Sequence, residues 1–139
     1  IIAGVADGLG LYEEVISVIV TRGLAEMKRF CQNQGIALEA LYGLSGLGDL
    51  ALTCYSPASS HNKNFGRRIG KGETTDQILA SMKGTVAEGY YTTKAVFDIS
   101  QKENIDLPLC QGIYRVIYEN KSVRESMITL MSRPLKVED

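Results

Sequence analysis

The sequence predicts an all-α fold, and three observations support that prediction. Apolar residues recur at helical spacing through most of the chain, and little of it alternates as a half-buried strand would. Helix boundary signals occur repeatedly, among them the capping-box pair Thr74 and Gln77 and the stop residue Gly35. Hydrophobic residues make up 45% of the 139 positions and charged residues 22%, which is enough apolar material for one core. We expect about seven or eight helices joined by short links in one multi-helix globular domain.

The longest expected helix covers residues 12–34. Its apolar residues, from Val15 to Phe30, fall on one broad face, and Glu13 and Glu14 lie in the first turn, as the helix dipole favours. Shorter helices are expected at 38–43, 46–55, 62–70, from Thr74, at 86–103, at 108–120, and from Ser122 to a point before Pro134. The chain opens on Ile-Ile-Ala-Gly, which is typical of the middle of a helix, so we expect it to be a fragment of a longer protein.

Glycines in two helical stretches predict close packing. The stretch "GVADGLG" contains Gly4, Gly8 and Gly10, but it lacks the spacing and the preceding strand of a dinucleotide fingerprint. Gly4 and Gly8 lie four residues apart, so they share one helix face and favour a close helix–helix contact. Gly23 lies inside the long helix, where glycine costs roughly 1 kcal/mol relative to alanine. We expect close backbone packing to explain Gly23 as well.

Charge and cysteine content exclude several classes of function. The formal net charge is −1, so no basic field attracts nucleic acid. The three cysteines Cys31, Cys54 and Cys110 lack C-x-x-C spacing, and with a single histidine they give no zinc signature. No segment resembles a signal peptide, and the longest apolar stretch is too short to cross a bilayer. We expect no metal, no nucleic-acid partner and no membrane insertion, and the cysteine pattern favours the reducing cytoplasm.

The stretch "GLSGLGDLALTC" places glycines around one carboxylate, Asp49. Glycine-rich runs often hold phosphate, but this one lacks the lysine of a P-loop. A carboxylate near a helix start can cap backbone N–H groups, and spacing alone favours that role slightly. Thr53 lies one turn further on the same helical face, so the two side chains could instead bind a polyol.

The most basic stretch is "SSHNKNFGRRIGKG", residues 59–72. It combines lysines and arginines with Ser60, His61 and Asn62, and cations beside hydroxyl and amide donors describe an oxyanion or phosphate site. A solvated basic loop is the alternative that composition alone favours. Glu88 starts the long helix expected at 86–103, where it is either a cap or an acceptor for a ligand amide or ribose hydroxyl.

The ordered set of motifs is more specific than any one of them. "GVADGLG", "VTRGLAEM", "GLSGLGDLALTC", "NFGRRIGKG", "VAEGYYTTKAV" and "SRPLKVED" follow one another along the chain. Together they closely resemble the C-terminal domain of bacterial-type NAD(P)-dependent glycerol-3-phosphate dehydrogenase, over essentially all of residues 1–139. The resemblance implies a substrate-binding helical domain of the 6-phosphogluconate dehydrogenase C-terminal-like fold. It also implies an N-terminal Rossmann domain, absent from this chain, that binds NAD or NADP.

The resemblance further implies a reaction and a setting. Family members are cytoplasmic oxidoreductases, commonly homodimers, that interconvert dihydroxyacetone phosphate and sn-glycerol 3-phosphate for glycerophospholipid biosynthesis. The family's catalytic lysine would precede Ile1, so we expect the 139-residue chain alone to lack dehydrogenase activity. Two alternatives remain: the C-terminal domain of a related two-domain hydroxy-acid dehydrogenase, and a stand-alone helical interaction module.

Site residues follow from the resemblance position by position. Asp49 would orient the upstream lysine and contact substrate, and Thr53 would lie in the same pocket. His61 stands where the family has arginine, so Lys63 or a neighbouring arginine would have to supply the missing charge. The implied substrate contacts are Asp49, Thr53, Ser60, His61 and Asn62, and the implied cofactor contacts are His61, Val86 and Glu88.

Overall fold

The computed structural model describes residues 1–11, 13–56, 60–82 and 87–133, and every regular element in these ranges is helical. The α-helices are α1 (Ile2–Gly8), α2 (Glu13–Asn33), α3 (Asp49–Tyr55), α4 (His61–Gly70), α5 (Thr75–Ser81), α6 (Glu88–Lys102), α7 (Pro108–Tyr118) and α8 (Val123–Met131). A 3₁₀ turn, η1 (Glu39–Tyr42), and a π-helical turn, η2 (Leu44–Gly48), precede α3. The predicted all-α fold is therefore confirmed.

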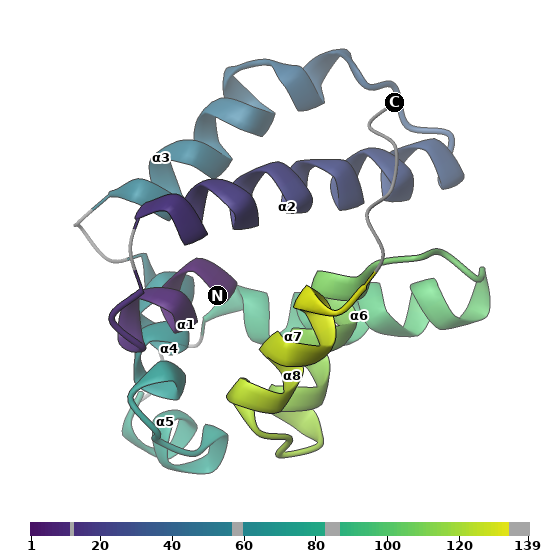
Figure 1. Ribbon diagram of the computed structural model, residues 1–139. Coiled ribbons are helices and arrows are strands. Elements are labelled where there is room, and N and C mark those ends of the chain that lie inside the picture. Colours follow the sequence, from purple (N-terminus) through teal and green to yellow (C-terminus); the bar gives the residue numbers. More distant parts are fainter. Residues whose placement is uncertain (12, 57–59, 83–86, 134–139) are drawn as a thin grey trace.

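The long helix α2 runs across the molecule and separates two groups of elements (Figure 1). η1, η2 and α3 pack along one side of α2, whereas α1 and α7 contact it from the other side. On that second side, α4 packs against α1 and α5 packs against α4, while α6 and α8 both pack against α7. This arrangement brings α3 and α4, consecutive in the chain, to the same end of the molecule (Figure 1).

Local sequence signals place most helix boundaries correctly. Thr74 and Gln77 form the expected capping box, with each side chain bonded to the other residue's backbone N–H. Ser122 caps α8 by accepting a hydrogen bond from the Glu125 backbone N–H. Pro108 occupies the first turn of α7, where its missing N–H costs no helical hydrogen bond.

The contact between α1 and α4 is close enough to exclude any side chain at its centre. A Cβ atom added to Gly4 would lie 2.0 Å from the Lys63 carbonyl oxygen, and one added to Gly8 would lie 2.2 Å from the Arg67 carbonyl oxygen. The predicted helix contact through these glycines is confirmed. The matching expectation for Gly23 is wrong within the described part of the chain, because no atom there outside the nearby backbone of α2 lies within 4 Å of a Cβ placed at Gly23.

Two hydrophobic clusters lie on opposite faces of α1. One contains Val5 with residues of α4, α5 and α7, including the fully buried Phe65 and Ile78. The other contains Ala3 and Ala6 with residues of α2 and α3, including Val20. The short helix α1 therefore joins both clusters, and its position fixes where α3 and α4 lie relative to each other.

A buried carboxylate holds α7 against α2. Glu26 of α2 is only 7% exposed, and it accepts hydrogen bonds from the backbone N–H groups of Leu109 (2.6 Å) and Cys110 (3.1 Å). These groups belong to the first turn of α7, whose N–H groups no helical carbonyl can satisfy. Arg29 adds a hydrogen bond from Nε to the Asp106 carbonyl oxygen at 2.9 Å. Burial raises the pKa of Glu26, although the two N–H donors and Arg29 act in the opposite direction.

Two glycine-to-alanine substitutions test the α1–α4 contact. In the intact protein, Gly4→Ala should lower the free energy of unfolding by about 1–3 kcal/mol, because the new methyl group must push α1 away from α4. Gly23→Ala is the matched control and should raise it by up to about 1 kcal/mol, because the site is open and helical. Urea unfolding measures both changes. Equal effects of the two substitutions would contradict the packing described here.

The raised pKa of Glu26 predicts a specific pH dependence. The folded state binds this proton more tightly than the unfolded state, so the stabilisation is complete below the ordinary pKa of 4.5. It is then lost as the pH rises through the folded-state pKa. Relative to the Glu26→Gln variant, the wild-type protein should therefore lose free energy of unfolding as the pH rises above about 4.5. Parallel stability curves for the two proteins would show that Glu26 does not titrate this way.

Candidate functional site

Three helix ends that carry the predicted site residues are tied together by hydrogen bonds. The Asn62 side-chain oxygen, in the first turn of α4, accepts a hydrogen bond from the Gly89 backbone N–H at 2.8 Å. Gly89 belongs to the first turn of α6, so the starts of α4 and α6 meet at this bond. The Lys63 ammonium donates to the carbonyl oxygens of Cys54 (2.9 Å) and Ser56 (2.7 Å), at the end of α3.

Ser60 and His61 mark the start of α4. The Ser60 side chain caps this helix by accepting a hydrogen bond from the Lys63 backbone N–H at 3.1 Å, and its hydroxyl proton remains able to donate elsewhere. His61 is the first helical residue and is exposed to solvent. The basic stretch is therefore a capped helix, and the alternative of a solvated loop is wrong for residues 61–70.

Asp49 and Thr53 lie one turn apart on α3. Asp49 is the first residue of the helix and is exposed, whereas Thr53 is half-buried. No side chain caps the start of α3 in the described part of the chain, so the capping role for Asp49 is not observed. Both side-chain oxygens face the same side of the helix because of the four-residue spacing.

Glu88 is the first residue of α6 and is exposed, and Ala87 precedes it as the N-cap residue. The structure shows no side-chain hydrogen bond that caps this helix from within α6. Instead, Asn62 of α4 satisfies one of the N–H groups of its first turn. Val86, the other expected cofactor contact, lies outside the described residues.

Three cations of the basic stretch, Lys63, Arg67 and Arg68, are bound to other protein groups. Lys63 is buried and bonded to two carbonyl groups. Arg67 pairs with Asp7 of α1 through Nε at 2.8 Å, and Arg68 pairs with Glu73. The two arginines lie in the last turn of α4, roughly 9 Å along the axis from His61.

The electrostatic character of the site therefore comes mainly from backbone groups. Each helix start presents the positive end of the helix dipole, although Ser60 and Asn62 already accept hydrogen bonds from one first-turn N–H group each. Two such starts, of α4 and α6, adjoin at Asn62 and Gly89. Helix starts of this kind favour phosphate and other anions without needing a charged side chain.

Sequence patterns did not reveal two contributors, Lys63 and Gly89. The sequence indicates Lys63 only as a replacement for the family arginine, and it could not predict the burial of this side chain because that depends on the folded position of α3. Gly89 registered only as the neighbour of Glu88, because its partner Asn62 lies 27 residues away in the chain. Neither contact leaves a local periodic or capping signal.

Other chemistry is not evident in the described residues. No group of three or more potential metal ligands occurs among them. Burial raises the pKa of the Cys54 thiol, and burial together with Glu26 raises that of Cys110 to about 12, so both remain protonated near neutral pH. Across residues 1–133, wherever the chain is described, no helix is long and apolar enough to cross a membrane.

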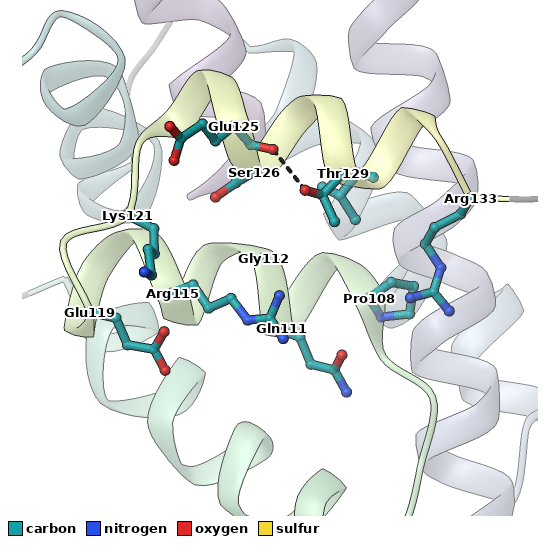
Figure 2. Close-up of a pocket in the computed structure, with 11 residues that line it drawn as sticks. Pro108, Gln111, Gly112, Arg115, Glu119, Lys121, Glu125, Ser126, Thr129 and Arg133 are labelled. Atoms are coloured by element: carbon teal, nitrogen blue, oxygen red, sulfur yellow. Dashed lines mark hydrogen bonds between the residues drawn. The ribbon is translucent and has the colours of Figure 1, made fainter.

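A separate groove of about 540 Å³ lies between α7 and α8 (Figure 2). Its walls carry charges of both signs, including Arg115, Glu119 and Glu125. It contains none of the predicted site residues, and its Arg133 already pairs with Asp106 at 2.8 Å. We therefore place the candidate site at the helix ends, where the predicted residues and the anion-binding geometry coincide.

Comparison with known proteins shows the family of this chain. The family model described as NAD-dependent glycerol-3-phosphate dehydrogenase C-terminus matches residues 1–128. Curated relatives named glycerol-3-phosphate dehydrogenase [NAD(P)+] include one from Chlorobium chlorochromatii, 41% identical over 96% of this chain and 39% of its own length. Another, from Leuconostoc mesenteroides, is 42% identical over 99% of this chain and 40% of its own length.

Comparison with solved structures points to the same family as comparison of the sequences. The crystal structure of glycerol-3-phosphate dehydrogenase from Coxiella burnetii matches with a TM-score of 0.87 and 35% identity, covering 94% of this chain and 40% of that one. The chain thus spans about two fifths of the length of these relatives. It belongs to the family of NAD-dependent glycerol-3-phosphate dehydrogenase C-terminal domains.

Proposed function

We propose that residues 1–139 form the substrate-binding domain of a two-domain NAD(P)-dependent sn-glycerol-3-phosphate dehydrogenase. The observation that carries this proposal is the Asn62–Gly89 hydrogen bond, which joins the starts of α4 and α6 beside Ser60 and His61. A phosphorylated three-carbon substrate needs an anion site at one end and hydroxyl or carbonyl partners at the other. The starts of α4 and α6 would provide the anion site, and Asp49 and Thr53 would provide the partners for the hydroxyl or carbonyl groups.

The phosphate group would be held at the start of α4. Ser60 can donate its hydroxyl proton, Asn62 keeps its side-chain NH₂ group as a donor, and His61 lies exposed between them. The helix starts supply the positive potential that an arginine supplies in other family members. Binding through a group that does not react orients the carbonyl carbon for the chemical step.

Asp49 and Thr53 would act at the reacting end. Thr53 would donate a hydrogen bond to a substrate oxygen, and Asp49 would hold a lysine from outside this chain charged and oriented toward the developing alkoxide. NADH or NADPH, when bound, would supply the hydride. Glu88, exposed at the start of α6, would contact the cofactor together with His61 and Val86.

The remaining parts of the proposal concern partners. The relatives extend well beyond the length of this chain, which supports an N-terminal Rossmann domain as the main cofactor-binding partner. We also propose a homodimer acting in the cytoplasm, which would supply sn-glycerol 3-phosphate for glycerophospholipid synthesis.

Substrate comparison tests the proposed reaction. The full-length protein should oxidise NADH or NADPH with dihydroxyacetone phosphate, and unphosphorylated dihydroxyacetone should give a kcat/KM lower by at least about 100-fold, because it lacks the orienting phosphate. Residues 1–139 alone should show no turnover in the same absorbance assay. Equal activity on both substrates, or turnover by the isolated chain, would refute the proposal.

Substitution of Asp49 tests its assigned role. In the full-length protein, Asp49→Asn should lower kcat by about 100-fold or more while leaving KM for the nicotinamide cofactor nearly unchanged, because only the lysine loses its partner. Glu39→Gln removes one negative charge from the neighbouring exposed turn and serves as the matched control. Steady-state kinetics would contradict the role if Asp49→Asn and Glu39→Gln had the same kcat.

A further inference from the structure

Lys63 is a buried cation whose ammonium group donates hydrogen bonds to backbone carbonyl groups. Only 7% of the residue is exposed, and its Nζ atom donates to the carbonyl oxygens of Cys54 at 2.9 Å and Ser56 at 2.7 Å. These carbonyls close α3, where the helix leaves acceptors without partners and carries the negative end of its dipole. The ammonium group both satisfies these acceptors and offsets their negative potential.

The backbone of Lys63 is held as firmly as its side chain. Its N–H donates to the Ser60 hydroxyl at 3.1 Å, which caps α4. Its carbonyl oxygen faces Gly4 of α1, where a Cβ atom would approach it to 2.0 Å. Because both its backbone and its side chain are bound, Lys63 links the end of α3 to the start of α4.

The tether joins the two halves of the proposed substrate site. Thr53 lies in the last turn of α3, next to the Cys54 carbonyl that Lys63 binds. Ser60 and Asn62 flank Lys63 on α4, and Asn62 extends the connection to Gly89 of α6. The negative end of α3 therefore adjoins the helix start that would hold the phosphate, and the ammonium group lies between them.

We infer that Lys63 is a positioning residue, which sets the spacing between the phosphate-binding start of α4 and the polyol-binding face of α3 while neutralising the carbonyl end of α3. It acts through Thr53, Ser60 and Asn62, since two of the three N–H donors of its ammonium group are bound to protein carbonyls. This inference rests on the proposed function.

Kinetics of the full-length protein test the inference. The readout is the ratio of kcat/KM for dihydroxyacetone phosphate to that for dihydroxyacetone. Lys63→Met should lower this ratio by about tenfold, because only the phosphorylated substrate spans both halves of the site. Lys63→Arg should restore most of it, since a guanidinium can donate to both carbonyls. A partial loss of folded protein lowers both rates equally, so it cannot by itself produce a fall in this ratio.

Two further variants keep the test decisive. Lys94→Met removes the same charge from an exposed ion pair with Asp98 on α6, so it should leave the ratio at the wild-type value. If Lys63→Met fails to fold, Lys63→Gln replaces it, because glutamine keeps a donor for one carbonyl but lacks the charge. A wild-type ratio in whichever of Lys63→Met and Lys63→Gln is fully folded would overturn the inference.

Hydrogen exchange separates this inference from the proposed function. Amides in the last turn of α3 should exchange faster in Lys63→Met than in Lys94→Met, with or without substrate. Unchanged exchange would overturn the tether itself. Faster exchange in a protein that shows no preference for dihydroxyacetone phosphate would overturn the proposed function and the role of Lys63 at a phosphate site, while showing that the structural tether exists.

Discussion

The close approach of α1 to α4 is the constraint on which the arrangement of the other helices depends. Glycines on both helices let each backbone meet the other's carbonyl groups, as at Gly4 with Lys63 and at Gly66 with Ile1. A helix as short as α1 gains most of its stability from such packing. Because α1 has one hydrophobic cluster on each face, its contact with α4 also fixes α3. The proposed site thus lies on helices whose relative positions follow from this glycine contact.

The charges of α4 are used to hold helices together, and the site gains its positive potential from backbone groups. Lys63 closes α3, Arg67 reaches Asp7 of α1, and Arg68 reaches Glu73 just beyond α4. Aligned N–H groups at two helix starts remain to attract an anion. In the proposed function, these backbone groups take the place of the arginine that the resemblance implies at the position of His61.

A second set of contacts positions α6 from the other side of the molecule. Glu26 and Arg29 attach the start of α7 to α2, and α7 in turn packs along α6. Phe97 of α6 and Tyr114 of α7 stack with their ring centroids 3.6 Å apart. The Tyr118 hydroxyl then donates to the Tyr90 carbonyl oxygen at 2.7 Å, close to the start of α6. Interior contacts of α7 therefore support the helix end that Asn62 binds.

The sequence by itself determined the secondary-structure elements of this protein, whereas the tertiary structure decided which side chains of these elements bind one another. Periodicity, helix caps and the spacing of Gly4 and Gly8 are local signals, so they predicted the all-α fold, most helix boundaries and the α1–α4 contact. The shared face of Asp49 and Thr53 follows from helical spacing in the same way. Burial of Lys63, the cap that Glu26 provides and the open surface at Gly23 depend on segments distant in the chain or on the packed position of whole helices. Such contacts exist only after folding, because no local pattern encodes which helix end a side chain will reach.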